Sequence, residues 1–183
     1  MLKQFVIEEL KEQDKETVRR RLVESYEQYA ADYSDPKVWK EYRDSIVASI
    51  DNPNVYKILV AKSGQEVLGS LQLFLSSEDA YQKPELGIFA PIIRLLGVHP
   101  DARSLGVAQE LIKESIRYAK YKGASQLYLH SSDKMHKAIK LYEWIGFRRD
   151  LTKEFQTHDI HVKCYCLDFL TGNQIFINND MVT

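Results

Sequence analysis

Apolar residues recur with a helical period in the first third of the chain. Val18, Leu22 and Tyr26 are spaced at about one helical turn and predict a helix over residues 15–33. A second apolar stripe, opened by an Asp-Pro pair, predicts another helix over residues 36–50, because proline is tolerated in a first helical turn. Two helices therefore lead into the rest of the domain.

Shorter apolar runs indicate strands. Residues 3–9 resemble a short first strand, and residues 55–63 and 66–76 form a hairpin pattern around Gly64-Gln65. The run at 91–99 is apolar throughout, which predicts a strand buried on both faces. Between the hairpin and this strand, residues 77–90 show no regular period and are expected to form a loop.

The pattern then changes back to a helical one. An amphipathic helix is expected to start near Ser104 and to stop at Gly123, ahead of a strand at 125–131. A helical crossover joins strands 91–99 and 125–131, so these two strands should be parallel.

The last third predicts a further helix over about 133–145 and a strand pair at 147–155 and 160–170. Together the elements predict a single α/β domain with a mixed, twisted sheet of about six to seven strands flanked by about four helices. We place this domain at residues 1–172 and a C-terminal tail at 173–183.

Composition narrows the functional classes. The chain has 183 residues and a net charge of −1, which gives no overall attraction to nucleic acid or to an anionic membrane. No apolar run approaches the roughly 20 residues that span a bilayer. The N-terminus becomes acidic after six residues, unlike a signal peptide. We expect a cytoplasmic protein without nucleic-acid or membrane partners.

The two cysteines, Cys164 and Cys166, are separated by one residue. On a strand they would point to the same face and form a poor disulfide pair. No second cysteine pair completes a metal site, so we expect reduced packing cysteines and no metal.

The segment LLGVHPDARSLGVAQELI, residues 95–112, contains a compact turn from a strand into a helix. A helix start offers unpaired N–H groups to an anion, Gly106 lets a ligand approach the backbone, and Arg103 adds positive charge. The segment is neither a P-loop nor a GxGxxG motif. Taken alone, it fits an ordinary turn or a nucleotide-binding or interaction domain as well as a phosphate site.

A second motif, AIKLYEWIGF at residues 138–147, changes this interpretation. With RSLGVA in the first segment, it makes the chain resemble the GCN5-related N-acetyltransferase (GNAT) family. The resemblance is clear over roughly residues 55–150, where the order, spacing and strand–helix context of both motifs agree.

The resemblance implies an acetyl-coenzyme A site. The pyrophosphate would lie on the loop and helix start, namely Arg103, Ser104, Leu105, Gly106, Val107 and Ala108. The pantetheine arm would pair with the preceding strand around Leu96, Gly97 and Val98, and a backbone N–H near Val98 would hold the developing oxyanion. This strand and strand 125–131 would splay apart to form the cleft. The acceptor amine would attack directly, so no nucleophilic serine or cysteine is needed.

The family's tyrosine in this motif corresponds to Tyr142. A phenol with a pKa of about 10 is protonated at neutral pH and could protonate the leaving thiolate. The alternative is that Tyr142 is one more aromatic residue on an apolar helix face.

Two positions depart from the family pattern. Met135 stands where many members have an asparagine that contacts the cofactor arm, and Ile92 stands where many have a glutamate that acts as general base. Glu85, His99 and His130 are the remaining candidates for a base, and each also has a purely structural interpretation. A base is dispensable if the amine loses its proton to water.

The acceptor side is less specific. In the family the leading helices border the acceptor pocket, and here they carry aromatic residues: Tyr26, Tyr29, Tyr33, Trp39 and Tyr42. These rings could hold an ammonium or an apolar group, or simply pack.

We therefore predict an N-acetyltransferase that moves acetyl from acetyl-CoA to a primary amine: a small molecule, a peptide N-terminus or a lysine. The alternative is an acyl-CoA-binding sensor with little turnover. A homodimer is compatible with the family, although no residue pattern indicates an interface.

Overall fold

The computed structural model describes residues 4–178, which form two compact units. The first unit contains the chain up to Leu73 and the segment Leu95–Glu114. The second contains Phe74–Arg94 and the chain from Ser115 onward. The chain passes from one unit to the other inside a strand, β4, and inside a helix, α4, so both elements are shared.

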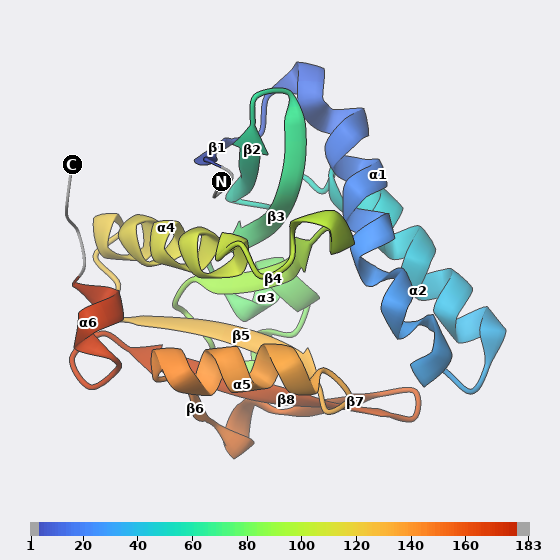
Figure 1. Ribbon diagram of the computed structural model, residues 1–183. Coiled ribbons are helices and arrows are strands. Elements are labelled where there is room, and N and C mark those ends of the chain that lie inside the picture. The colour runs from blue at the N-terminus through green and yellow to red at the C-terminus, as the bar shows by residue number, and fades with distance from the viewer. Residues whose placement is uncertain (1–3, 179–183) are drawn as a thin grey trace. The chain divides into compact units, whose positions relative to one another are not determined.

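The first unit holds the leading helices and the hairpin (Figure 1). Its complete elements are β1 (Val6–Glu9), η1 (Glu12–Asp14), α1 (Lys15–Tyr26), η2 (Glu27–Asp32), α2 (Pro36–Ser49), β2 (Lys57–Ser63) and η4 (Pro100–Ala102). It also contains all but the last residue of β3 (Glu66–Phe74). Two further elements, β4 (Ile92–Val98) and α4 (Val107–Tyr121), are divided between the units, and the first unit holds the second part of β4 and the first part of α4.

The strand order in the first unit is β1-β2-β3-β4. β1 and β2 pair antiparallel, with Val6 opposite Lys62, and β2 pairs antiparallel with β3 around a turn in which Gly64 has a φ of +60°. Both hairpin strands are almost wholly buried. Burial of each Leu or Ile side chain here contributes about 1.5–3 kcal/mol.

Helix α1 lies close to the end of β4 because Gly97 has no side chain. A Cβ at Gly97 would lie 3.0 Å from Ser25 Cβ and 3.1 Å from Leu22 Cδ1, both on α1. Gly69 on β3 is equally constrained, since its Cβ would lie 2.8 Å from the Gly97 carbonyl oxygen. Two glycines on neighbouring strands thus allow the close packing of α1, β3 and β4.

The second unit holds the remaining elements: the first half of β4, α3 (Ser77–Tyr81), η3 (Pro84–Leu86), the second half of α4, β5 (Gln126–Ser132), α5 (His136–Ile145), β6 (Arg148–Arg149), η5 (Leu151–Lys153), β7 (Phe155–Thr157), β8 (Ile160–Asp168) and α6 (Gln174–Ile177).

Its strand order is β4-β5-β8-β6, with β7 also paired to β8. β5 and β8 pair antiparallel from Gln126 opposite Asp168 to Ser132 opposite Val162. β4 and β5 are parallel, as predicted, with Ile92 opposite Tyr128 and Ile93 opposite Leu129. Two residues later, Leu95 has a φ of +50°, a left-handed conformation that interrupts a regular strand.

The α/β fold class predicted from the sequence is confirmed. Residues 4–178 contain one mixed sheet of eight strands and six α-helices. Four of these helices, α1, α2, α4 and α5, have at least ten residues and correspond to the predicted ones.

Several local predictions are wrong in detail. The expected loop at 77–90 contains α3, which Ser76 caps by accepting a hydrogen bond from Asp79 N–H at 3.1 Å. The first long helix ends at Tyr26 and continues as the 3-10 helix η2. The expected strand at 147–155 is split by η5. β4 is buried on both faces only at Ile92 and Ile93, and burial alternates after them.

The boundary at residue 172 stays a prediction, and residues 179–183 of the expected tail lie outside the described residues. The described part that follows the boundary packs onto the second unit. Asn173 N–H donates to Ile145 C=O at 3.0 Å, and Phe176 and Ile177 on α6 are buried.

A buried carboxylate organises the β7–β8 hairpin. Glu154, 6% exposed, accepts from Arg149 at 2.7 and 2.8 Å and lies 2.8 Å from His161 Nε2. It also accepts from Cys164 N–H at 3.1 Å. The Arg149 guanidinium, above all, lowers the pKa of Glu154 from 4.5 to about 2.

This shift predicts a pH-dependent contribution to stability. The folded-state pKa of Glu154 is depressed, so its contribution is complete above pH 4.5 and is lost as the pH falls toward about 2. Glu154→Gln should therefore unfold at a lower temperature than the wild type at neutral pH, and the gap should shrink in acid. Thermal unfolding over this pH range measures it, with Glu143→Gln, an exposed carboxylate of the same unit, as control. A gap that does not change with pH would contradict the assignment.

Candidate functional site

The loop between β4 and α4 has the backbone geometry of an anion cradle. α4 begins at Val107, not near Ser104 as the sequence predicted, because Ser104 and Gly106 have φ values of +66° and +80°. Left-handed residues within a turn aim successive N–H groups into a concavity that suits anions. The 15-residue helix α4 adds its unpaired N-terminal N–H groups and its positive dipole end.

The space in front of this loop is open. A Cβ at Gly106 would meet only Gln109 Oε1, at 3.9 Å, so a ligand can approach the Gly106 backbone. Arg103 is exposed and adds a guanidinium to this loop. The donor set, main-chain N–H groups and one guanidinium, therefore fits a phosphate or pyrophosphate.

The end of β4 presents a second row of main-chain groups. His99 N–H donates to Leu68 C=O on β3 at 2.8 Å. Because peptide directions alternate along a strand, Gly97 also faces β3, whereas Leu96 and Val98 direct their N–H and C=O groups to the opposite edge. Such an edge can pair with an extended chain, as a pantetheine arm would require.

Tyr26 reaches this same edge from α1. Its hydroxyl donates to Leu96 C=O at 3.1 Å, and its ring would lie 3.3 Å from a Cβ at Gly97. Sequence reasoning placed Tyr26 only among the aromatic residues of the leading helices. Helical spacing shows on which face of α1 Tyr26 lies. It does not show that Tyr26 forms a hydrogen bond with a strand residue 70 positions later.

Among the candidate bases, His99 has both ring nitrogens engaged. Nε2 lies 2.7 Å from Glu24 Oε2, and Nδ1 accepts from Asp101 N–H at 3.2 Å. It is also 9% exposed and caps η4. This arrangement supports a structural role, in which His99 ties α1 to the end of β4.

His130 lies on β5 in the second unit. Its Nε2 lies 3.0 Å from Lys153 C=O, which fixes the Nε2–H tautomer, and Nδ1 is buried without a partner among the described residues. Burial lowers the pKa of His130, which keeps the ring neutral. The rings of Tyr81 and Phe155 pack on it at 4.8 and 5.3 Å. The neutral ring could accept a proton at Nδ1, but the rings of Tyr81 and Phe155 cover the imidazole.

The other predicted positions occupy different environments. Glu85 is exposed on η3, whereas Ile92 is fully buried and carries no acid–base group. Met135 is the residue that precedes α5. Tyr142 lies on α5 in the second unit, is 5% exposed and packs against Phe147 at 5.9 Å between ring centres. The structure thus groups Leu96–Val98 and Arg103–Ala108 within the first unit, and Tyr142 belongs to the second.

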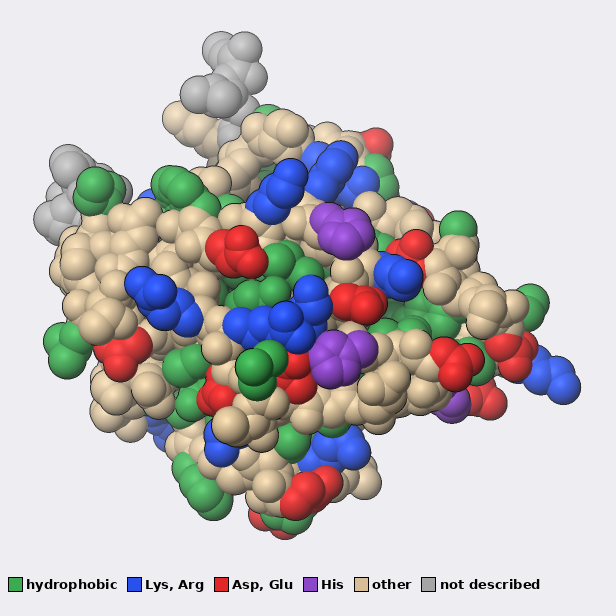
Figure 2. Space-filling view, turned by 90° about the horizontal axis from the view of Figure 1, so that it is seen from below, with side chains coloured by type: hydrophobic (Ala, Val, Ile, Leu, Met, Phe, Trp, Pro, Cys, Tyr) green, Lys and Arg blue, Asp and Glu red, His purple; other side chains and the backbone are tan. Residues whose placement is uncertain are grey.

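Charge and metal-binding groups are dispersed. Acidic and basic side chains are interspersed over the face that Figure 2 shows. Within residues 4–178, no cluster of three or more His, Cys, Asp or Glu side chains could hold a metal ion. Cys164 and Cys166 are free thiols, and burial raises the pKa of both. Over the same residues, no helix is long and apolar enough to cross a bilayer.

Comparison with protein families settles the membership of the chain. The profile of the acetyltransferase (GNAT) family matches residues 15–147, well over half of the sequence. The chain belongs to this family. It is an acetyltransferase, and such enzymes take the acetyl group from acetyl-CoA. No curated protein sequence matches the chain.

Solved structures of acetyltransferases share the fold. An acetyltransferase of the family from Staphylococcus aureus has a TM-score of 0.66 at 17% identity, covering 90% of this chain and 99% of its own. The PaiA N-acetyltransferase from Thermoplasma acidophilum, in complex with coenzyme A, has a TM-score of 0.62 at 19% identity, covering 88% and 98%. An acetyltransferase from Streptococcus agalactiae has a TM-score of 0.63 at 16% identity, covering 90% and 98%.

Two glycines allow a matched test of the cradle. Gly106 and Gly123 have φ values of +80° and +81°, and an added Cβ makes no close contact at either. Alanine at each position should cost a similar backbone strain, about 1 kcal/mol. Only Gly106→Ala should also weaken coenzyme A binding, because only Gly106 belongs to the cradle.

Calorimetric titration with coenzyme A and thermal unfolding of both variants measure these effects. Equal coenzyme A affinities for Gly106→Ala and Gly123→Ala, at similar stability, would show that the loop is not the phosphate site.

Proposed function

We propose that this acetyltransferase transfers the acetyl group of acetyl-CoA directly to a primary amine, with the cosubstrate held mainly by main chain. The observation that carries the proposal is that the first unit contains both the β4 edge opposite β3, at Leu96 and Val98, and the cradle at Arg103–Ala108. Bound acetyl-CoA would supply an activated acyl group and a thiolate leaving group.

Main-chain groups of the first unit would bind the cosubstrate and stabilise the reacting thioester. Main-chain N–H groups of the cradle, with Arg103, bind the pyrophosphate, whose charge suits the start of α4. The β4 edge orients the extended arm by strand-like pairing. A backbone N–H near Val98 stabilises the oxyanion that develops on the thioester carbonyl. The amine attacks directly, which agrees with the buried position of Cys164, whose raised pKa opposes nucleophilic thiolate chemistry.

Tyr142 is the proposed proton donor. As the amine forms its bond to the acyl carbon, the carbon–sulfur bond breaks and the thiolate takes the phenolic proton. The nitrogen releases one proton to water, and water returns a proton to the Tyr142 phenolate. The acceptor is a primary amine of a small molecule, a peptide N-terminus or a lysine side chain. A homodimer and a cytoplasmic location remain predictions from the sequence.

An acyl-CoA sensor is the second candidate, and Met135 and Ile92 favour it. These two residues replace the polar groups that many family members use at the corresponding positions. A sensor would bind acetyl-CoA without transferring its acetyl group.

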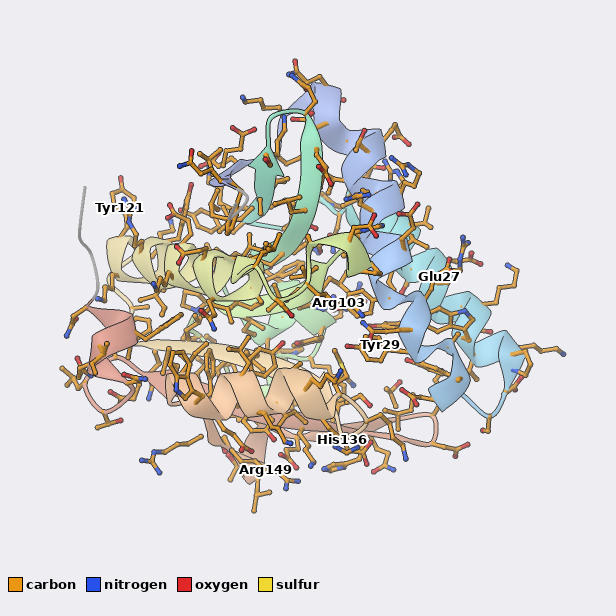
Figure 3. The ribbon with its side chains drawn as sticks, viewed as in Figure 1. Glu27, Tyr29, Arg103, Tyr121, His136 and Arg149 are labelled. Carbon is orange, nitrogen blue, oxygen red and sulfur yellow. The ribbon has the colours of Figure 1, made fainter. Side chains whose placement is uncertain are left out.

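Release of free thiol from acetyl-CoA with a panel of primary amines distinguishes the two candidates. We expect amine-dependent release, and a fall in kcat of about 100-fold in Tyr142→Phe with little change in coenzyme A affinity. Tyr121→Phe is the matched control, because Tyr121 is 86% exposed on α4 (Figure 3). Binding without turnover on any amine would support the sensor. Full activity of Tyr142→Phe would remove this residue from the mechanism.

A further inference from the structure

Five aromatic side chains of α1, η2, the residue that follows η2, and α2 form one connected group beside the end of β4. We call this group the aromatic platform; it consists of Tyr26, Tyr29, Tyr33, Trp39 and Tyr42. Only Tyr26 is buried, and the other four rings are partly exposed. Four adjoining, partly exposed rings offer a ligand an aromatic surface at one place, and aromatic faces attract cations.

The rings contact one another in sequence, outward from the strand. Tyr26 lies 5.7 Å from Tyr29 and 6.2 Å from Tyr42, measured between ring centres. Tyr42 then contacts Tyr33 at 5.9 Å and Trp39 at 6.0 Å, and Tyr33 and Trp39 are 5.4 Å apart. α1 and α2, which supply most of these rings, run side by side in Figure 1.

Tyr26 connects the platform to the proposed acyl site. Its hydroxyl donates to Leu96 C=O, on the edge of β4 that would hold the thioester arm. An acceptor whose amine attacks there would extend its remaining atoms over the neighbouring rings. The platform and the β4 edge both belong to the first unit, so this adjacency is a direct feature of the unit.

The charges around the platform favour a cation on its outer part. Burial, followed by the field of Asp32, raises the pKa of Tyr33, and both also raise that of Tyr29, so these phenols stay neutral. Asp32 is exposed and forms no ion pair among the described residues. Neutral electron-rich rings beside an uncompensated carboxylate attract an organic ammonium.

Arg103 is the opposing charge. The positive charge of Arg103 opposes the rise in the pKa of Tyr29, so Arg103 lies near that ring. Figure 3 shows Arg103 and Tyr29 on facing segments. Arg103 belongs to the phosphate cradle, where a bound pyrophosphate would neutralise it. Tyr33, which directly follows Asp32 in the chain, lies in the field of that carboxylate, and Trp39 packs on Tyr33.

We propose that the aromatic platform binds a second, cationic group of the acceptor, so that the preferred substrates are diamines. This inference rests on the proposed function. One amine, in its neutral form, attacks at the β4 edge, while the other stays protonated over Tyr33 and Trp39, with Asp32 as counter-ion. The platform would thereby set the specificity of the acetyl transfer.

Three acceptors of matched length test this inference: 1,6-diaminohexane, 1-aminohexane and 6-aminohexanoate. The wild type should prefer the diamine over the monoamine in kcat/KM by about threefold to thirtyfold, the range that a cation–π contact provides. The amino acid, whose far end is anionic, should be the poorest acceptor.

Two variants connect that preference to the platform. Trp39→Leu removes a ring and Asp32→Asn removes the carboxylate, and each should bring the diamine-to-monoamine ratio of kcat/KM values toward one. Asp159→Asn, which removes an exposed carboxylate from the β7–β8 turn, is the control and should keep the preference. Thermal unfolding identifies any loss of folding in Trp39→Leu, and Asp32→Asn, at an exposed position, gives an independent result.

Equal kcat/KM values for the three acceptors would overturn the platform inference but leave the acetyltransferase proposal standing. A wild-type preference that both variants retain would also overturn it. If no amine releases thiol although coenzyme A binds, the proposed function fails and the inference fails with it.

Discussion

The hydrogen bond from His99 N–H to Leu68 C=O determines the direction of the main-chain groups at the end of β4. By fixing one peptide of β4 against β3, it fixes the direction of the peptides before it. Gly97 then faces β3, and Leu96 and Val98 face the other edge. The proposed thioester site depends on this edge, and the cradle follows within a few residues. His99 also pairs with Glu24, so the same residue holds α1 against the strand.

Close packing around this strand excludes side chains where main chain is needed. Gly97 lies under Ser25 and Leu22, and Gly69 lies against the Gly97 carbonyl. This packing brings Tyr26 within hydrogen-bonding distance of Leu96. The strand side of the proposed site is therefore closely packed. The loop at Arg103–Gly106, which is exposed at Arg103 and Ser104, would let phosphate groups approach.

Long periodic segments and paired motifs could be predicted from the sequence. α2, α4, the hairpin and the parallel β4–β5 pair follow from hydrophobic period and from turn residues such as Gly64. RSLGVA and LYEWIGF together predict the cradle as a phosphate site, and that assignment stays a prediction. The sequence places the start of α4 three residues too early, because Ser104 adopts a left-handed backbone conformation. Serine rarely adopts this conformation, so the residue type gives no indication of it. The same holds for Leu95. The Tyr26–Leu96 bond and the two engaged nitrogens of His99 depend on tertiary packing, which sequence period does not encode.

The central claim is that main-chain groups of β4 and of the following loop hold acetyl-CoA. Backbone amide resonances of the isotope-labelled protein during titration with acetyl-CoA measure this most directly. The account predicts that the amides of Leu96 and Val98 and those of residues 104–108 shift together with a single affinity. Saturable binding that leaves these amides unmoved, and shifts a different set, would contradict it.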